Sequence, residues 1–293
     1  MTDEPRRWGL GEFLGLFDLE DLGAGVYKAA NPARGPWTRV FGGQVIAQAI
    51  RSAQLTVPAE RAVHSAHAYF IRPGKVGEPI YFHVERPRDG RSFTTRYVKA
   101  AQGPEVIFDM IASFHVAEEG AEFQVPRATD VPPPQDAPEP EMPIEFRGRM
   151  RSMMPFDMRE LGPQPVGASP YRSTRRVWFR ATERLPDDPA LHACVLAFAS
   201  DMGTVSAARA PAEGEDTWVT FTRFMSASLD HAIWFHRPVR ADDWILMDLR
   251  AISNHGARGL AMGTMHTQDG VLAVSIAQEA LIRQLRSEAP PQT

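Results

Sequence analysis

Asp201 is the acidic residue whose surroundings best suit acid–base chemistry. It follows the apolar segment 194–199 and lies near the C-terminus of the helix predicted there. The negative end of a helix dipole disfavours an anion by about 0.3–1 kcal/mol, and apolar neighbours raise the pKa of a carboxyl group toward neutrality. A carboxylate in this setting suits the role of a general base. The alternative is a solvated aspartate after a helix end.

Gln278 and Ser228 are two further polar residues in apolar settings. Gln278 lies in the last predicted strand, where period two puts it on one face with apolar residues only: Leu272, Val274, Ile276, Ala280 and Ile282. A buried amide costs about 1–3 kcal/mol unless it is hydrogen-bonded, so Gln278 needs polar partners, whether structural or functional. Ser228 begins the strand predicted at 228–235, where a hydroxyl is usually part of turn chemistry.

The motifs of several well-known enzyme classes are missing from the sequence. It contains no Gly-x-Ser-x-Gly, no His-Glu-x-x-His and no phosphate loop. The nine histidines show no metal-ligand spacing, so the sequence predicts neither a metal nor a cofactor. Asp230 and His231 are neighbours on a strand and point to opposite faces, so they do not form an acid–base dyad. Cys194, the single cysteine, is expected to be buried and inert.

The chain contains two similar halves. Each begins with a helical pattern, at 41–53 and at 190–202, and continues with period-two strands that favour antiparallel pairing. Arg72 and Arg237 lie in matching Phe-x-Arg-Pro strings 165 residues apart, and the same offset relates Val106 to Val271. The offset predicts an internal duplication and an α+β fold.

The duplication helps to separate scaffold from function, because a polar residue present in one half only is not needed by the fold itself. At the 165-residue offset, Ser113 corresponds to Gln278 and Val63 corresponds to Ser228. Both Gln278 and Ser228 are thus particular to the second half, which favours a functional role.

A proline-rich segment separates the halves and predicts three regions: an N-terminal unit (1–120), an extended linker (121–170) and a C-terminal unit (171–293). Within the linker, residues 144–150 are predicted to form a short strand or turn. The formal net charge of −4 gives no basis for nucleic-acid binding. No apolar stretch is long enough to span a bilayer, and no signal peptide is evident, so a cytoplasmic protein without membrane insertion is expected.

Five groups of short strings resemble the acyl-CoA thioesterase II family. They are VFGGQV at 40–45, VHS at 63–65 with YFIRPG at 69–74, ASD at 199–201, LDH at 229–231 with WFHRP at 234–238, and TQDGV at 267–271. They occur in family order over nearly the whole chain. The resemblance implies a double hotdog, in which each unit wraps an antiparallel sheet around one central helix, and it suggests homo-oligomers such as dimers or tetramers.

The resemblance also implies a catalytic set of Asp201, Ser228 and Gln278. These three groups would activate one water for the hydrolysis of a fatty acyl-CoA thioester to a free fatty acid and CoA, with Asp201 as the base. Many relatives have threonine in place of Ser228. Gly42 and Gly43 open the first helix, where backbone N–H groups lack intrahelical acceptors, and are candidates for substrate binding.

Two other functions compete with this interpretation. A non-catalytic acyl-CoA-binding protein on a thioesterase scaffold is one, although all three polar positions are filled. A double-hotdog enoyl-CoA hydratase is the other, but hydratases carry Gly-Asp-x-Asn-Pro-x-His, whereas here Asp201 is followed by Met202, Gly203 and Thr204. The sequence leaves the acyl-chain preference, the CoA-phosphate contacts and the oligomeric state open.

Overall fold

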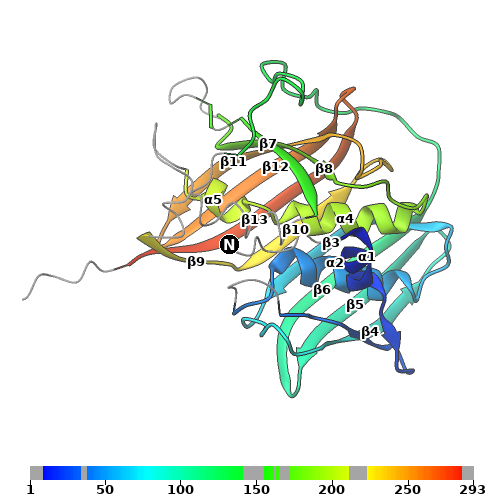
Figure 1. Cartoon of the computed structure of the whole chain (residues 1–293). Helices are drawn as coiled ribbons and strands as arrows, with labels where there is room; N and C mark the ends of the chain where they lie inside the picture. The colour runs from blue at the N-terminus through cyan, green and yellow to red at the C-terminus, as the bar shows by residue number, and fades with distance from the viewer. Residues whose placement is uncertain are drawn as a thin grey trace, which may run out of the picture.

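Two helices at the centre of the protein, α2 (Gly42–Gln54) and α4 (Pro189–Ser200), pack against each other (Figure 1). The computed structural model describes residues 9–33, 38–140, 155–161, 163–164, 172–210 and 223–285; the strand or turn predicted at 144–150 lies outside them. α4 begins at Pro189, behind the N-cap Asp188, whose side chain accepts a hydrogen bond from the Ala190 amide. Apolar on nearly every side, it is buried from Leu191 to Ser200 apart from the half-buried Ala193. The described chain also forms three short helical segments: α1 (Leu10–Leu14), η1 (Gly15–Phe17) and α5 (Thr204–Ala208).

One antiparallel sheet runs through both halves in the order β1-β2-β4-β5-β6-β3-β10-β13-β12-β11-β8-β7, and β9 also pairs with β13. Its strands are β1 (Glu20–Asp21), β2 (Val26–Ala29), β3 (Arg61–Phe70), β4 (Ile80–Asp89), β5 (Phe93–Gln102), β6 (Glu105–Val116), β7 (Phe156–Glu160), β8 (Arg175–Ala181), β9 (Phe224–Ser228), β10 (Asp230–Phe235), β11 (Ile245–His255), β12 (Arg258–Thr267) and β13 (Leu272–Gln284). The halves meet where β3 pairs with β10. One hydrophobic core includes both central helices and both halves of the sheet. The predicted double hotdog is confirmed.

The strand register corrects one detail of the predicted duplication. β10 and β3 do differ by 165 residues, since Phe235 pairs with Val274 and Phe70 with Phe108, but these partners on β13 and β6 differ by 166. Thr267 and Val271, which share a backbone hydrogen bond at the turn before β13, enclose three residues, whereas the paired residues Gln102 and Glu105 before β6 enclose two. The counterpart of Gln278 is therefore Ala112, not Ser113.

The proline-rich segment contributes more structure than a linker. β7 pairs with β8 at the edge of the sheet. Val131 and Ala137 pack against Trp178 and Leu246 in a second small core, and the Trp178 indole N–H donates to the Pro132 carbonyl at 2.9 Å. Because proline lacks a backbone donor but keeps its carbonyl, the proline-rich part around Pro132 can pack on the sheet without pairing as a strand.

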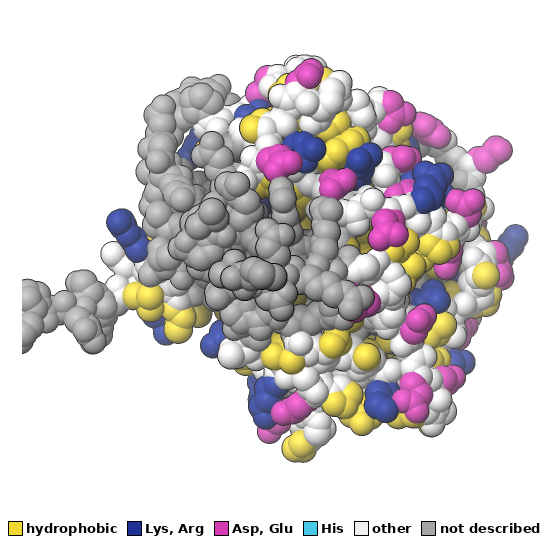
Figure 2. Space-filling view, in the orientation of Figure 1, with side chains coloured by type: hydrophobic (Ala, Val, Ile, Leu, Met, Phe, Trp, Pro, Cys, Tyr) yellow, Lys and Arg dark blue, Asp and Glu magenta, His cyan; other side chains and the backbone are white. Residues whose placement is uncertain are grey.

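The molecular surface and the helices agree with the charge and hydropathy of the sequence. On the face shown in Figure 2, basic and acidic side chains are interspersed rather than gathered by sign. Among the described residues, no helix is long and apolar enough to cross a membrane.

Candidate active site

Asp201 is the C-cap of α4 and lies against the first turn of α2. Its side chain is buried, with the residue only 7% exposed. The Gly43 amide donates to Asp201 Oδ2 at 3.0 Å. A Cβ atom on Gly42 would lie 2.7 Å from the same oxygen, so only glycine permits this approach. The N-terminus of α2 thus offsets the unfavourable dipole of α4 at this carboxylate.

The second oxygen of Asp201 meets two hydroxyl groups. Thr204 Oγ1 donates to Asp201 Oδ1 at 3.3 Å, and Ser228 Oγ donates to it at 3.5 Å. The side-chain amide of Gln278 donates to Ser228 Oγ at 2.8 Å. Asp201, Ser228 and Gln278 come from α4, β9 and β13, and they meet in one connected group.

Burial raises the pKa of Asp201 to about 6, although hydrogen bonds from Gln278, Gly43, Thr204 and Ser228 lower it. Desolvation of the anion exceeds the combined effect of its four donors. Such a carboxylate is ionised at neutral pH and is still basic enough to accept a proton.

His231 completes the group, and sequence reasoning did not select it. The ring is 1% exposed; Nδ1 contacts Gln278 Oε1 at 2.5 Å and Nε2 contacts Ser200 Oγ at 2.8 Å. Asp230 lies on the other face of β10 and accepts from the Glu279 amide, so the two neighbours do not form a dyad, as predicted. The comparison of the two halves could have identified His231, because the residue at the 165-residue offset is an alanine, the buried Ala66, so the histidine is particular to the second half.

Cys194 takes no part in the group. It is buried, its thiol donates to Gln54 Oε1 at 3.3 Å, and burial raises its pKa to about 12. It is therefore a buried thiol, as predicted. Over the described ranges, no cluster of three or more His, Cys, Asp or Glu side chains is arranged to hold a metal ion.

Comparison with known proteins identifies the relatives of the chain. Residues 33–115 match the family described as acyl-CoA thioesterase N-terminal domain, and residues 165–281 match the acyl-CoA thioesterase family. Acyl-coenzyme A thioesterase 8 of Homo sapiens is 37% identical, over 92% of this chain and 88% of that protein. Acyl-CoA thioesterase 2 of Haemophilus influenzae is 32% identical, over 94% of this chain and 98% of that protein.

A solved structure agrees with these relatives. The acyl-CoA thioesterase II TesB2 of Mycobacterium marinum is 36% identical and superposes with a TM-score of 0.78, over 94% of this chain and 99% of that one. The chain belongs to the acyl-CoA thioesterase II family. As a member of this family, it is a thioester hydrolase that acts on acyl-CoA. The comparisons therefore favour hydrolysis over both competing functions.

Proposed function

We propose that Asp201, Ser228 and Gln278 hold and activate the water that hydrolyses a fatty acyl-CoA thioester. The observation that carries this proposal is the buried Asp201 carboxylate with its near-neutral pKa. It accepts a hydrogen bond from the Ser228 hydroxyl, which in turn accepts one from the Gln278 amide. Ser228 and the Gln278 amide orient the water oxygen toward the substrate, and Asp201 accepts the proton.

The proposed hydrolysis has two steps, and Asp201 first accepts and then returns one proton. Water oxygen attacks the thioester carbonyl carbon as its proton passes to Asp201, and the carbonyl oxygen becomes an oxyanion. Collapse of this intermediate breaks the carbon–sulfur bond, and the proton on Asp201 passes to the departing CoA sulfur. The products are a fatty acid and CoA, with no covalent acyl-enzyme required.

The backbone amides of Gly42 and Gly43 have different parts in this proposal. The Gly43 N–H already donates to Asp201. Gly42 lies one residue earlier, in the first turn of α2, where N–H groups have no intrahelical acceptor. We assign oxyanion donation to Gly42 and carboxylate orientation to Gly43.

The test is release of free CoA thiol from acyl-CoAs of graded chain length, comparing the unmodified chain with Asp201→Asn. We expect turnover of medium to long fatty acyl-CoAs, and activity that persists after dialysis against EDTA. Binding of acyl-CoA without thiol release would instead support the non-catalytic alternative.

Three further aspects of the protein remain predictions. One is the division into units at 1–120 and 171–293 joined by 121–170, to which β7 now adds a strand within the joining segment. The others are assembly into homo-oligomers, which size-exclusion chromatography with light scattering would measure, and a cytoplasmic location.

A further inference from the structure

His231 bridges the last residue of α4 and the middle of β13. One ring nitrogen contacts Ser200 and the other contacts Gln278, and the imidazole is almost fully buried between them. Neither Asp201 nor Ser228 touches the ring directly by any hydrogen bond among the described residues. Of the three residues of the proposed set, the ring therefore contacts Gln278 alone, and its other partner, Ser200, is the chain neighbour of Asp201.

The hydrogen bonds around Gln278 fix which end of its amide faces His231. The Gln278 nitrogen donates to Ser228 Oγ, so its carbonyl oxygen faces the ring. An amide oxygen only accepts, and the proton therefore lies on His231 Nδ1. Burial lowers the pKa of His231 to about 4, so the ring is neutral and Nε2 is an acceptor. The Ser200 hydroxyl lies 2.8 Å from both Nε2 and the Ala197 carbonyl, and shares its one proton between them.

If the Gln278 amide were rotated by half a turn, its NH₂ group would face the His231 N–H. Two donors would then meet in a buried place, and Ser228 would face a carbonyl oxygen instead of a donor. The imidazole thus selects one of the two amide orientations, and in that orientation the Ser228 hydroxyl is left free to donate to Asp201.

The first half shows that the fold itself does not need this histidine. The strand register matches His231 with Ala66 and Gln278 with Ala112, which pair with each other and are both buried. Ser228 matches Val63 in the same way, since Ser228 pairs with Ala280 and Val63 pairs with Phe114. The second half therefore contains His231 together with Ser228 and Gln278. In the first half, all three positions are occupied by apolar residues.

We propose that His231 is a positioning residue of the hydrolase: it holds the Gln278 carbonyl oxygen so that the amide N–H groups face Ser228 and the attacking water. This inference rests on the proposed function of Asp201, Ser228 and Gln278. It assigns His231 a role in orientation, without contact to substrate.

The decisive variant is His231→Phe, which fills the space without donating to Gln278. We expect kcat to fall by about 10- to 100-fold, the loss typical when a residue that orients an active-site side chain is removed. KM should be unchanged. Hydrogen bonds from Gln278 and Ser228 lower the pKa of Asp201, so the acid limb of the kcat profile should move to higher pH. In a Gln278→Ala background, His231→Phe should cause no further loss.

Two additional variants keep the test informative if the phenylalanine variant folds poorly. His231→Asn retains a donor near the Nδ1 position and should keep most of the activity. The matched control is His64→Phe, because His64 also contacts a hydroxyl at 2.8 Å, that of Ser113 on the last strand of the first half; it should leave kcat unchanged.

Several results would overturn the inference. They are full kcat in His231→Phe, an equal loss in His231→Asn, or a loss in the Gln278→Ala background as large as in the unmodified chain. Asp201→Asn is measured in parallel. If that variant keeps its rate, the proposed catalytic set fails, whereas additivity between His231 and Gln278 would reject the positioning role alone.

Discussion

The two ends of the central helix pair look alike in outline but differ in chemistry. At one end, α2 begins without a capping side chain on Phe41, and the Asp201 carboxylate of α4 accepts from its first turn. At the other end, α4 begins behind its own cap, Asp188, and its first residue is a proline. The Asp201 carboxylate thus occupies the place that an N-cap side chain would otherwise fill.

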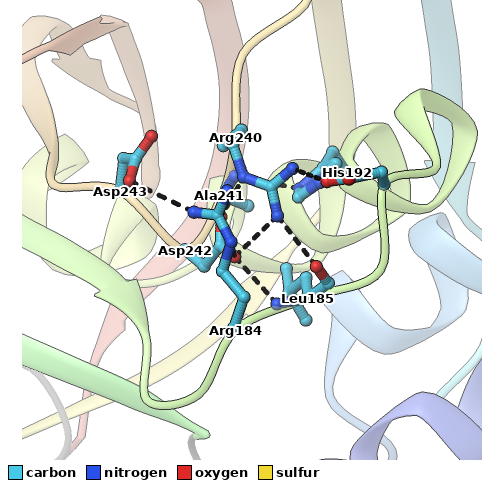
Figure 3. A network of polar contacts seen from close by, with 8 residues as sticks. Arg184, Leu185, His192, Arg240, Ala241, Asp242 and Asp243 are labelled. Carbon is cyan, nitrogen blue, oxygen red and sulfur yellow. Dashed lines mark hydrogen bonds and ion pairs between the residues drawn. The ribbon is translucent and has the colours of Figure 1, made fainter.

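The C-terminal ends of the two helices also differ, and again the polar group is at the Asp201 end. The C-cap of α2 is Leu55, where α4 has Asp201, and the preceding residue Gln54 makes neutral contacts to the Ala190 carbonyl and the Cys194 thiol. Around this end a charged network ties the loop before β11 to α4: Arg240 bonds Asp242 and the Leu185 carbonyl, and the Ala241 amide donates to His192 (Figure 3). The start of α4 is thus capped by its own Asp188, whereas the start of α2 donates the Gly43 N–H to the Asp201 carboxylate of the other helix.

The largest expected effect comes from removing the carboxylate. Asp201→Asn keeps the shape but not the base, and general-base contributions are about 10²–10⁴ in rate. We expect a loss of kcat in that range, while the melting temperature holds or rises. The assay is steady-state CoA release with a thermal melt. Asp230→Asn is the control, because Asp230 bonds the Glu279 backbone and should act mainly through stability. More than about a tenth of the rate in Asp201→Asn would reject the assignment.

The pKa of Asp201 predicts opposite pH dependences of activity and stability. Because the folded pKa is raised from 3.8 to about 6, the stability that this group contributes is fully present below about pH 3.8. It is lost as the pH rises to about 6, a difference on the order of 3 kcal/mol. kcat/KM should instead fall below about pH 6, as the base becomes protonated.

The pH prediction is tested by urea unfolding of the unmodified chain and Asp201→Asn across this range. The difference between their unfolding free energies should change with pH as described, which separates Asp201 from all other titrating groups. A difference that is constant from pH 4 to pH 7 would contradict a raised pKa.

A smaller effect is expected for the groups that orient water. Ser228→Ala and Gln278→Ala should each reduce kcat by less than Asp201→Asn does, roughly the 10- to 100-fold typical of residues that orient an active-site group. Because both act on one water, the double variant should lose much less than the product of the single losses. The measurement is a double-mutant cycle on kcat. Strict additivity would mean that the two groups serve separate steps.

Much of the fold and of this group could be predicted because local patterns encode them. Helical periodicity located α2 and α4, and an amide in an apolar row singled out Gln278. The direction of a strand side chain, however, changes with each residue inserted in the preceding loop. The extra residue in the hairpin before β13 therefore placed the counterpart of Gln278 one position away, at Ala112.

His231 and β7 were missed for different physical reasons. The sequence neighbours of His231 do not indicate its partners, because its contacts to Ser200 and Gln278 arise where α4 meets β13, 31 and 47 residues away in sequence. β7 lies in a proline-rich segment whose composition predicts an extended chain, and only its pairing with β8 makes it a strand. Both depend on tertiary contacts that composition and periodicity do not encode.

The smallest expected effect comes from placing an acid at the other helix end. Leu55→Asp puts a carboxylate at the C-cap of α2, the counterpart of Asp201, where Leu55 is 45% exposed. The helix dipole disfavours this anion by about 0.3–1 kcal/mol. At the start of α4, Pro189 has no N–H and the Ala190 N–H already donates to Asp188, so neither is available to offset that cost. Leu55→Asp should therefore lower stability slightly relative to Leu55→Asn. It should also leave CoA release unchanged, and it should not restore activity to Asp201→Asn. Recovery of turnover in the double variant, measured as thiol release, would show that either helix end can support catalysis once it carries an acid, and the glycine-opened start of α2 would lose its proposed role.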